Sequence, residues 1–221
     1  MKSLYSLLVI LFLITACSRE KAQDHSEFQS VNVEDIFETI SLSEELNLYV
    51  DEEGQPAEGR LTASYEDGSL RADVTFSEGM ISEGGIFRPD GSHFAGYTTS
   101  DEMMKYTIYF TTGDPNLVTL YGDDLADRRE FHVWQENGQR LVEFNQSMHR
   151  MWHENGQQSL EIPAIDGKTH GRTASWYENG QIKSEYHYIK GDLDGTYKEW
   201  DEDGNLMVER VYELGELVSD N

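Results

Sequence analysis

Two histidines four residues apart are the first candidates for chemistry in this chain. On a helix, the spacing of His149 and His153 would place two imidazole ligands for a metal ion on one face. His153, however, lies between Trp152 and a hairpin signal, which predicts a strand. Residues four apart in a strand are separated by about 13 Å, so we expect no shared metal site at this pair.

Two short acidic segments are the next candidates. Asp192-Leu-Asp194-Gly195 and Asp201-Glu-Asp203-Gly204 could bind calcium weakly, yet both lack the third acidic position and the distal Glu of a calcium loop. Asp also favours turns because its side chain bonds to the nearby backbone. The chain has no G-x-S-x-G elbow and no phosphate-binding loop. We therefore predict no catalytic residue, no cofactor and no metal, and a protein that is not an enzyme.

The most regular pattern in the sequence is a repeat marked by glycine and tryptophan. Residues 171–180 and 195–204 start 24 residues apart and share one pattern. In each segment a Trp lies five residues after the first Gly, and a second Gly lies nine residues after the first Gly. Another glycine, Gly191 or Gly215, comes eleven residues later, and Gly59, Gly68 and Gly79 keep the same spacings near the start. A fixed period of this length indicates one small structural unit built repeatedly.

Each unit carries a hairpin signal at its second glycine. Asn-Gly is the strongest two-residue hairpin signal because a type I′ turn needs positive φ at both central positions, and Asp-Gly serves the same geometry. For the unit at Asn179-Gly180, this turn predicts that Tyr177 faces Ile182 and that Ser175 faces Ser184. The predicted repeat-turn residues are Gly68, Asn137, Gly138, Asn155, Gly156, Asn179, Gly180, Asp203 and Gly204.

Aromatic side chains are expected on both faces of the resulting sheet. At two-residue spacing, Tyr186 and Tyr188 share one face with Tyr177, and Trp176 projects from the other. These rings either hold the sheet together or form a binding strip. The candidate binding surface is Trp134, Trp152, Trp176, Tyr177, Tyr186, Tyr188 and Trp200.

The units Gly-x4-Trp-Tyr-Glu-Asn-Gly-Gln and Gly-x3-Gly resemble the bacterial MORN-repeat variant family. The resemblance covers roughly residues 49–91 and 134–215. It implies an elongated antiparallel β-meander that serves as a scaffold or binding surface. Some bacterial relatives are labelled antitoxins of toxin–antitoxin systems, which implies a toxin as one kind of partner. Residues 94–129 depart from the repeat pattern.

The predicted fold class is therefore all-β, an elongated antiparallel β-meander of hairpin repeats of about 24 residues, with a short N-terminal helix over residues 33–40. The predicted divisions are a signal peptide at 1–16, a lipidated tether at 17–32 and degenerate repeats at 33–92. A nonrepetitive β insert follows at 93–129, and C-terminal repeats occupy 130–221.

The N-terminus has the pattern of an export signal. Lys2 precedes an unbroken apolar run at residues 7–14, which is too short to span a bilayer, and small residues lead to Cys17. The segment resembles a bacterial lipoprotein signal, which implies cleavage before Cys17 and a diacylglycerol on its thiol. We expect the chain to be lipid-anchored in the bacterial cell envelope. Ser18 after the cysteine favours the outer membrane, facing the periplasm, over the inner membrane.

The net charge of −25 limits the partners. Such a field repels nucleic-acid phosphates, so we expect no nucleic-acid partner, and it favours a basic protein. The function predicted is a lipid-anchored, non-catalytic scaffold that binds another protein. Two alternatives stay open: an antitoxin or immunity protein that neutralises a toxin, and an envelope hydrolase housed in residues 93–129.

Overall fold

The computed structural model describes residues 33–100 and 103–220. These residues form strands and turns, with one 3₁₀ turn, Val33–Asp35, and a small separate sheet of β1 (Ser41–Ser43) and β2 (Leu48–Val50). Among the described residues no helix has the length and apolar character needed to cross a membrane. Cys17 and the predicted signal and tether lie outside the described residues.

The remaining strands form one antiparallel sheet in which each strand pairs with its neighbours along the chain. The first strands are β3 (Gly59–Ser64), β4 (Leu70–Ser77), β5 (Met80–Phe87), β6 (His93–Ser100), β7 (Met103–Tyr109), β8 (Pro115–Tyr121), β9 (Arg128–Trp134) and β10 (Arg140–Asn145). They are followed by β11 (Met148–Trp152), β12 (Gln158–Ile165), β14 (Gly171–Trp176), β15 (Ile182–Ile189), β17 (Gly195–Trp200) and β18 (Leu206–Glu213). Short strands β13 (Lys168–Thr169), β16 (Asp192–Leu193) and β19 (Glu216–Asp220) pair with β12, β15 and β18.

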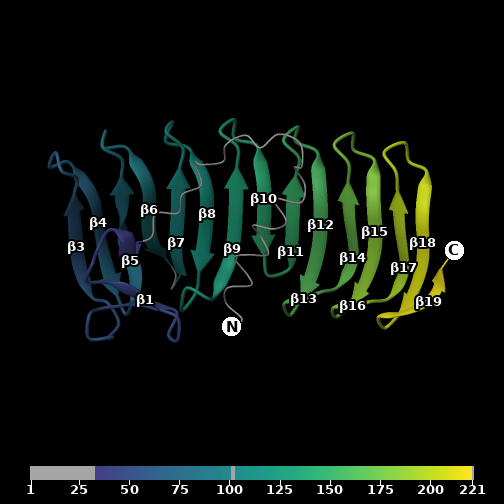
Figure 1. The fold of residues 1–221 in the computed structure, drawn as a ribbon, viewed down its shortest axis with the longest axis horizontal. Coiled ribbons are helices and arrows are strands. Elements are labelled where there is room, and N and C mark those ends of the chain that lie inside the picture. The colour runs from purple at the N-terminus through teal and green to yellow at the C-terminus, as the bar shows by residue number, and fades with distance from the viewer. Residues whose placement is uncertain (1–32, 101–102, 221) are drawn as a thin grey trace.

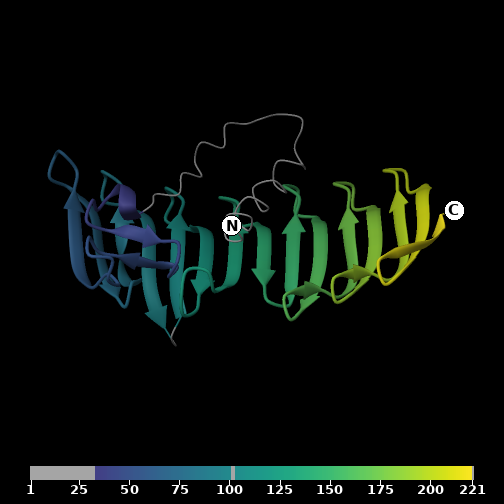
Figure 2. The same ribbon diagram turned by 60° about the horizontal axis from the view of Figure 1, so that its bottom comes forward.

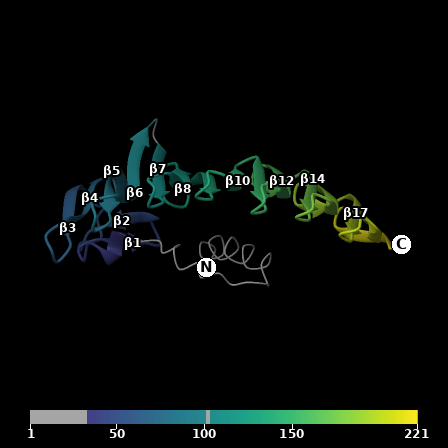
Figure 3. The same cartoon turned by 90° about the horizontal axis from the view of Figure 1, so that it is seen from above.

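The sheet is long and curved. Figure 1 shows the strands side by side, with β3 and β18 at opposite ends of the long axis. Seen from above, the sheet bends, and β1 and β2 lie on its concave side near one end (Figure 3). The predicted fold class, an antiparallel β-meander of hairpins, is confirmed.

The hairpins share one loop geometry along the upper edge of the sheet in Figure 1. In residues 177–181, the Tyr177 N–H donates to the Gln181 carbonyl at 2.9 Å, and the Gly180 N–H donates to the Tyr177 carbonyl at 2.9 Å. The same pair of hydrogen bonds closes residues 65–69, 88–92, 110–114, 135–139, 153–157 and 201–205 along this edge, and it also closes residues 51–55, which lie outside the sheet. The loop at 110–114 lies where the sequence repeat is lost, so the geometry continues without the sequence pattern.

The predicted type I′ turn at Asn-Gly is wrong. Gly180 has a φ of 84°, but the non-glycine residues with positive φ in the described chain are Asn47, Glu78, Asp166, Lys190 and Leu214. Each upper loop is instead a turn ending in a left-handed glycine, followed by a β-bulge. Trp176, and not Tyr177, therefore pairs with Ile182, whereas the predicted pairing of Ser175 with Ser184 is confirmed.

Two-residue turns with positive φ at both positions occur at the opposite edge of the sheet. They are Glu78-Gly79, Asp166-Gly167, Lys190-Gly191 and Leu214-Gly215. In three of these turns the glycine donates its N–H to a carbonyl 22 residues earlier. Gly79 donates to Ala57 at 3.1 Å, Gly191 to Thr169 at 2.8 Å and Gly215 to Leu193 at 2.8 Å. The Gly79–Ala57 hydrogen bond belongs to the N-terminal region, and the other two belong to the C-terminal repeats. The same spacing between hydrogen-bonded residues therefore occurs in both regions.

Residues 33–58, called the cap here, cover one end of the concave face (Figure 2). Val33, Phe37 and Ile40 pack on a buried cluster that includes Val74 and Phe76. Backbone hydrogen bonds also join the cap to turns of the main sheet. The Tyr49 N–H donates to the Gly79 carbonyl, and the Leu125 N–H donates to the Asn47 carbonyl. The helix predicted over residues 33–40 is reduced to the 3₁₀ turn Val33–Asp35, because successive turns suffice to bring these side chains onto the sheet.

A group of tyrosines lies beneath and beside the cap. The rings of Tyr97 and Tyr106 stack with centroids 4.9 Å apart, and Tyr49 meets Phe76 edge-on at 5.7 Å. Burial raises the pKa of the Tyr106 hydroxyl to about 12, and burial also raises the pKa values of Tyr49, Tyr97 and Tyr121. The neutral phenols are therefore part of the folded core.

This burial predicts alkaline destabilisation. An unfolded tyrosine loses its proton near pH 10, whereas folded Tyr106 keeps it until about pH 12. The unfolded state is therefore favoured as pH rises through this window, and the stabilisation is fully present below pH 10. Denaturant unfolding measured between pH 8 and pH 12 should show a falling free energy of unfolding above about pH 10, with a shallower fall in Tyr106→Phe. A variant with the same slope as the wild type would contradict the assignment.

Candidate functional site

One cross-strand row of side chains runs along the concave face from β3 to β18. Directly paired residues in an antiparallel sheet point to the same side, so the register defines the row. In strand order it consists of Ala63, Ala72, Ile86, Ala95, Ile108, Leu117, Val133, Val142, Met151, Leu160, Ser175, Ser184, Glu199 and Val208. The members from Ala72 to Ala95 are buried under the cap, which identifies the face.

A second row on the same face is rich in aromatic rings. It continues from the buried Tyr97 through Tyr106, Thr119, Phe131, Phe144, His149 and Ile162. The Arg128 guanidinium lies 5.3 Å from the Phe131 ring centroid and 5.6 Å from that of Phe144. Phe144 also contacts the His149 ring at 4.3 Å, and burial, with the nearby charge of Arg128, lowers the pKa of His149.

The cap reaches only the first part of these rows. Its cluster extends to Tyr121 and Leu125, and in Figure 3 no described segment covers the concave face beyond β9. We call the uncovered part the open strip: Phe131, Val133, Val142, Phe144, His149, Met151, Leu160, Ile162, Ser175, Ser184, Tyr186, Tyr197 and Glu199. Most of these side chains are half-buried, which leaves apolar and aromatic surface accessible to a partner.

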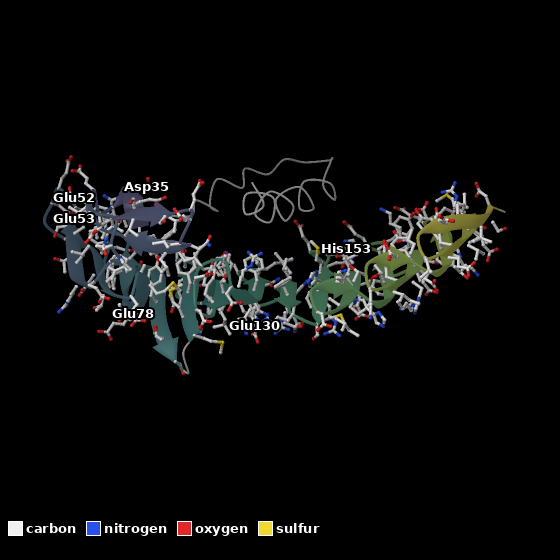
Figure 4. The ribbon with its side chains drawn as sticks, turned by 90° about the horizontal axis from the view of Figure 1, so that it is seen from below. Asp35, Glu52, Glu53, Glu78, Glu130 and His153 are labelled. Carbon is white, nitrogen blue, oxygen red and sulfur yellow. The ribbon has the colours of Figure 1, made fainter. Side chains whose placement is uncertain are left out.

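The convex face differs because it is charged. Arg150 pairs with Glu161 at 3.0 Å across β11 and β12, Arg172 with Glu185 at 2.5 Å, and Lys198 with Glu209 at 3.0 Å. Each of these ion pairs is partly solvated and stabilises the sheet by about 0.2–1 kcal/mol. Figure 4 shows Glu130 on this face, away from the cap, with Asp35, Glu52 and Glu53 on the cap itself.

The predicted binding surface is divided between the two faces. Trp134, Trp152, Trp176 and Trp200 each follow a member of the concave row, so they project toward the convex side at the upper strand ends. There the Arg140 guanidinium lies 6.0 Å from the rings of both Trp134 and Trp152, and Arg140 pairs with Glu143. The tryptophans shield the sheet beside the loops, and Trp200 in addition borders the open strip, where it helps to line a hollow next to Glu199.

The predicted tyrosines have different positions. Tyr186 lies in the open strip, stacked on Tyr197 with centroids 4.8 Å apart, and Tyr188 shares its face near the lower edge. Tyr177 is the first residue of an upper loop, and its hydroxyl donates to the Trp200 carbonyl of the next hairpin at 2.9 Å. Sequence reasoning missed the apolar members of the strip, such as Val142, Met151 and Leu160, because only the register aligns them.

The predicted turn residues connect neighbouring hairpins. The Asn155 side-chain amide donates to the Glu178 carbonyl at 2.7 Å, and that of Asn179 donates to the Glu202 carbonyl at 3.0 Å. At the same time, their side-chain oxygens accept the N–H two residues on, from Gln157 and Gln181. Asn137 differs, since its amide donates to Gln135 of its own loop.

Glycine is required in these loops for its conformation and for the space beside it. A Cβ at Gly180 would lie 2.7 Å from Gln157 Oε1, and one at Gly204 would lie 2.7 Å from Gln181 Oε1. Each Asn-Gly-Gln therefore places its glutamine over the glycine of the next loop. Gly68 and Gly138 have positive φ with open space around them, and Asp203 and Gly204 lie in the last loop, where Asp201 accepts the Asp203 and Asn205 N–H groups.

The two histidines singled out from the sequence, His149 and His153, lie in different parts of the structure and make different contacts. His149 packs in the open strip, whereas His153 Nε2 lies 2.8 Å from the Trp176 carbonyl in the upper loops. The described residues contain no group of three or more His, Cys, Asp or Glu side chains placed to hold a metal ion. The Asp192 and Asp194 segment is part of the lower edge, where an Asp194 carboxylate oxygen accepts the Leu214 N–H at 3.2 Å.

Comparison with known families agrees with this geometry. The family described as MORN repeat variant matches residues 169–190 and 193–214. Each matched segment starts near a short lower strand, includes one upper loop and ends at the residue before a lower turn glycine. The predicted likeness to MORN repeats is thus confirmed for these two units. No curated protein matches the chain.

The contacts between loops can be tested with a matched pair of substitutions. Asn155→Asp keeps the oxygen that accepts the Gln157 N–H but loses the amide that reaches Glu178. We expect it to lower the free energy of unfolding by about 1 kcal/mol or more, because a carbonyl loses its donor and faces a carboxylate. Asn137→Asp, which breaks only a contact within its own loop, should cost less. Equal effects in thermal unfolding would refute the role of these contacts.

Proposed function

We propose that this protein is a non-catalytic scaffold that binds another protein along the open strip. The observation that supports this most is the continuity of the concave face. The cap covers the first part of the cross-strand row with apolar side chains, and beyond it, where no described segment lies over the row, the row continues with the half-buried Val142, Met151 and Leu160. Soluble proteins rarely leave a contiguous apolar surface exposed unless it binds something.

The shape and charge of the sheet favour a protein segment as the ligand. A curved sheet of stacked hairpins offers an extended surface, as repeat proteins commonly do. The net charge of −25 disfavours nucleic acid and favours a basic partner. The convex face is a less suitable surface, because its Arg, Lys and Glu side chains are already paired with each other.

Site-specific photo-crosslinking tests which face of the sheet binds the partner. Tyr186 and His187 are adjacent in β15 and point to opposite faces, Tyr186 to the open strip and His187 to the convex side. With a benzophenone side chain at one of these positions, we expect partner-dependent crosslinks from position 186 and few from position 187 in intact cells. Equal yields, or crosslinks from position 187 alone, would rule out the open strip as the binding face.

The proposal includes attachment to a bacterial cell envelope through a lipid on Cys17. It rests on the apolar run at residues 7–14 and the small residues before the chain's single cysteine. Each buried methylene contributes about 0.8 kcal/mol to membrane binding, so two or more long acyl chains would make a durable anchor. The body would then face the periplasm from the outer membrane.

The anchor predicts a labelling result. Cells supplied with a traceable fatty acid should label the protein, and Cys17→Ser should abolish the label because the thiol that carries the lipid is gone. Cys17→Ser should also move the protein from the membrane fraction to the soluble fraction. Labelling that persists in this variant would disprove lipid attachment at Cys17.

A further inference from the structure

The open strip changes its chemistry toward its C-terminal end. From Val133 to Leu160 the cross-strand row is apolar, and then it continues as Ser175, Ser184 and Glu199. Glu199 is the charged member of the row, between Ser184 on one side and Val208 on the other. A half-buried carboxylate at this position costs desolvation energy and adds nothing to an apolar surface, so it calls for an explanation.

The groups around Glu199 form a small polar hollow. It has a volume of about 230 Å³ and is lined by Ser175, Tyr177, Lys183, Ser184, Tyr186, Glu199, Trp200 and Met207. The Ser175 and Ser184 hydroxyl oxygens are 2.5 Å apart, and Ser184 is only 3% exposed. Glu199 accepts a hydrogen bond from the Tyr197 hydroxyl, whose ring stacks on Tyr186.

The charges near the hollow sum to a negative value. Burial and then the charges of Glu202, Asp201 and Glu199 raise the pKa of the Tyr177 hydroxyl at its rim, which places three carboxylates near one point. Among the described residues that line the hollow, the cation is Lys183, whose ammonium lies 5.4 Å from the Tyr177 ring centroid. Arg210, which is next to Tyr197 on the same face, pairs with Asp220 at 2.9 Å. The lining itself therefore carries one charge of each sign, Glu199 and Lys183, and Asp201 and Glu202 of the neighbouring loop add negative charge near the rim.

We propose that this hollow binds a lysine or arginine side chain of the partner segment that occupies the open strip. The inference rests on the proposed function and adds the partner's chemistry and direction: apolar side chains over β9–β12, and a cationic side chain at β14–β17. A lysine ammonium has three donors, and the hollow offers the Glu199 carboxylate and the serine oxygens as acceptors. The face of the Tyr186 ring adds a cation–π contact.

The dimensions of the strip fix the length of the ligand. From Val133 to Glu199 the row crosses six strand spacings, which is about 29 Å at 4.8 Å each. An extended segment spans this distance with about nine residues. A second copy of this chain is disfavoured as the occupant, because both copies would bring the same strong negative charge.

A pair of synthetic peptides tests the inference on the full-length chain carrying Cys17→Ser. The probe is a peptide of about ten residues that alternates Val and Thr and has one lysine near an end. Its match has norleucine in place of lysine. We expect the lysine peptide to bind about tenfold more tightly, as one charge-assisted contact predicts. Glu199→Gln should remove the difference, whereas Glu185→Gln, with the same charge change on the convex face, should preserve it.

Each other result overturns the inference. If both peptides bind equally well, the open strip binds extended peptides without preferring a cationic side chain, and the proposed function survives. If neither peptide binds, or if Glu185→Gln acts like Glu199→Gln, no cation site exists in the hollow. Failure of the proposed function itself would be seen separately, as the loss of selective crosslinking from position 186.

Discussion

The structure depends on hydrogen bonds that each hairpin makes to the next one. Within the part of the chain that the structure describes, no second layer covers the sheet beyond the cap (Figure 3), so these strands are held in place by their neighbours. Side chains of the upper loops reach the following loop, as in Asn155 to Glu178 and Tyr177 to Trp200. Turn glycines of the lower edge donate to the preceding unit, as in Gly191 to Thr169. The hairpins β14–β15 and β17–β18 are thereby fixed at both edges, which accounts for the spacing of 24 residues between them.

Fixed edges leave the two faces free to differ. The convex face is covered by paired charges and tryptophans, and the concave face carries the apolar and aromatic rows. The cap packs on the concave rows to form a buried hydrophobic cluster at one end of the sheet. The open strip is the same surface where no described segment covers it, and its last members, Ser184 and Glu199, give it polarity at one end only. Binding along this strip would thus repeat, between two chains, the packing that the cap makes within one chain.

Much of the fold followed from the sequence because glycine spacing reports turns directly. The meander, the hairpin at Asn179-Gly180 and the pairing of Ser175 with Ser184 were predictable in this way. The type of turn was not, since Asn-Gly suits both a two-residue turn and a longer loop that ends in a left-handed glycine. Of the doubly left-handed turns, Asp166-Gly167 carries an Asp-Gly signal, whereas Lys190-Gly191 and Leu214-Gly215 carry none, because Lys and Leu do not favour positive φ. Their N–H groups are held by His170 and Asp194 of the previous unit, a contact that only the assembled sheet provides.

The candidate site was harder to predict. Aromatic residues attract attention in a sequence, and the four tryptophans were therefore placed in the binding surface, although they lie beside the loops on the convex side. Simple alternation decides this, because each tryptophan directly follows a member of the concave row, while the extra residue of the bulge lies in the next strand. Met151 and Leu160 have no distinguishing pattern in sequence. They become part of a surface only through pairing with Val142 on one side and Ser175 on the other.

The central claim is that the cap covers one end of the concave face and leaves the rest accessible, and thiol labelling tests it most directly. In a Cys17→Ser chain, a cysteine is placed either at Met104, which is 4% exposed beside the cap, or at Met151 in the open strip. The account predicts rapid reaction of a maleimide at position 151 and slow reaction at position 104. Slow reaction at both positions, or faster reaction at position 104, would contradict it.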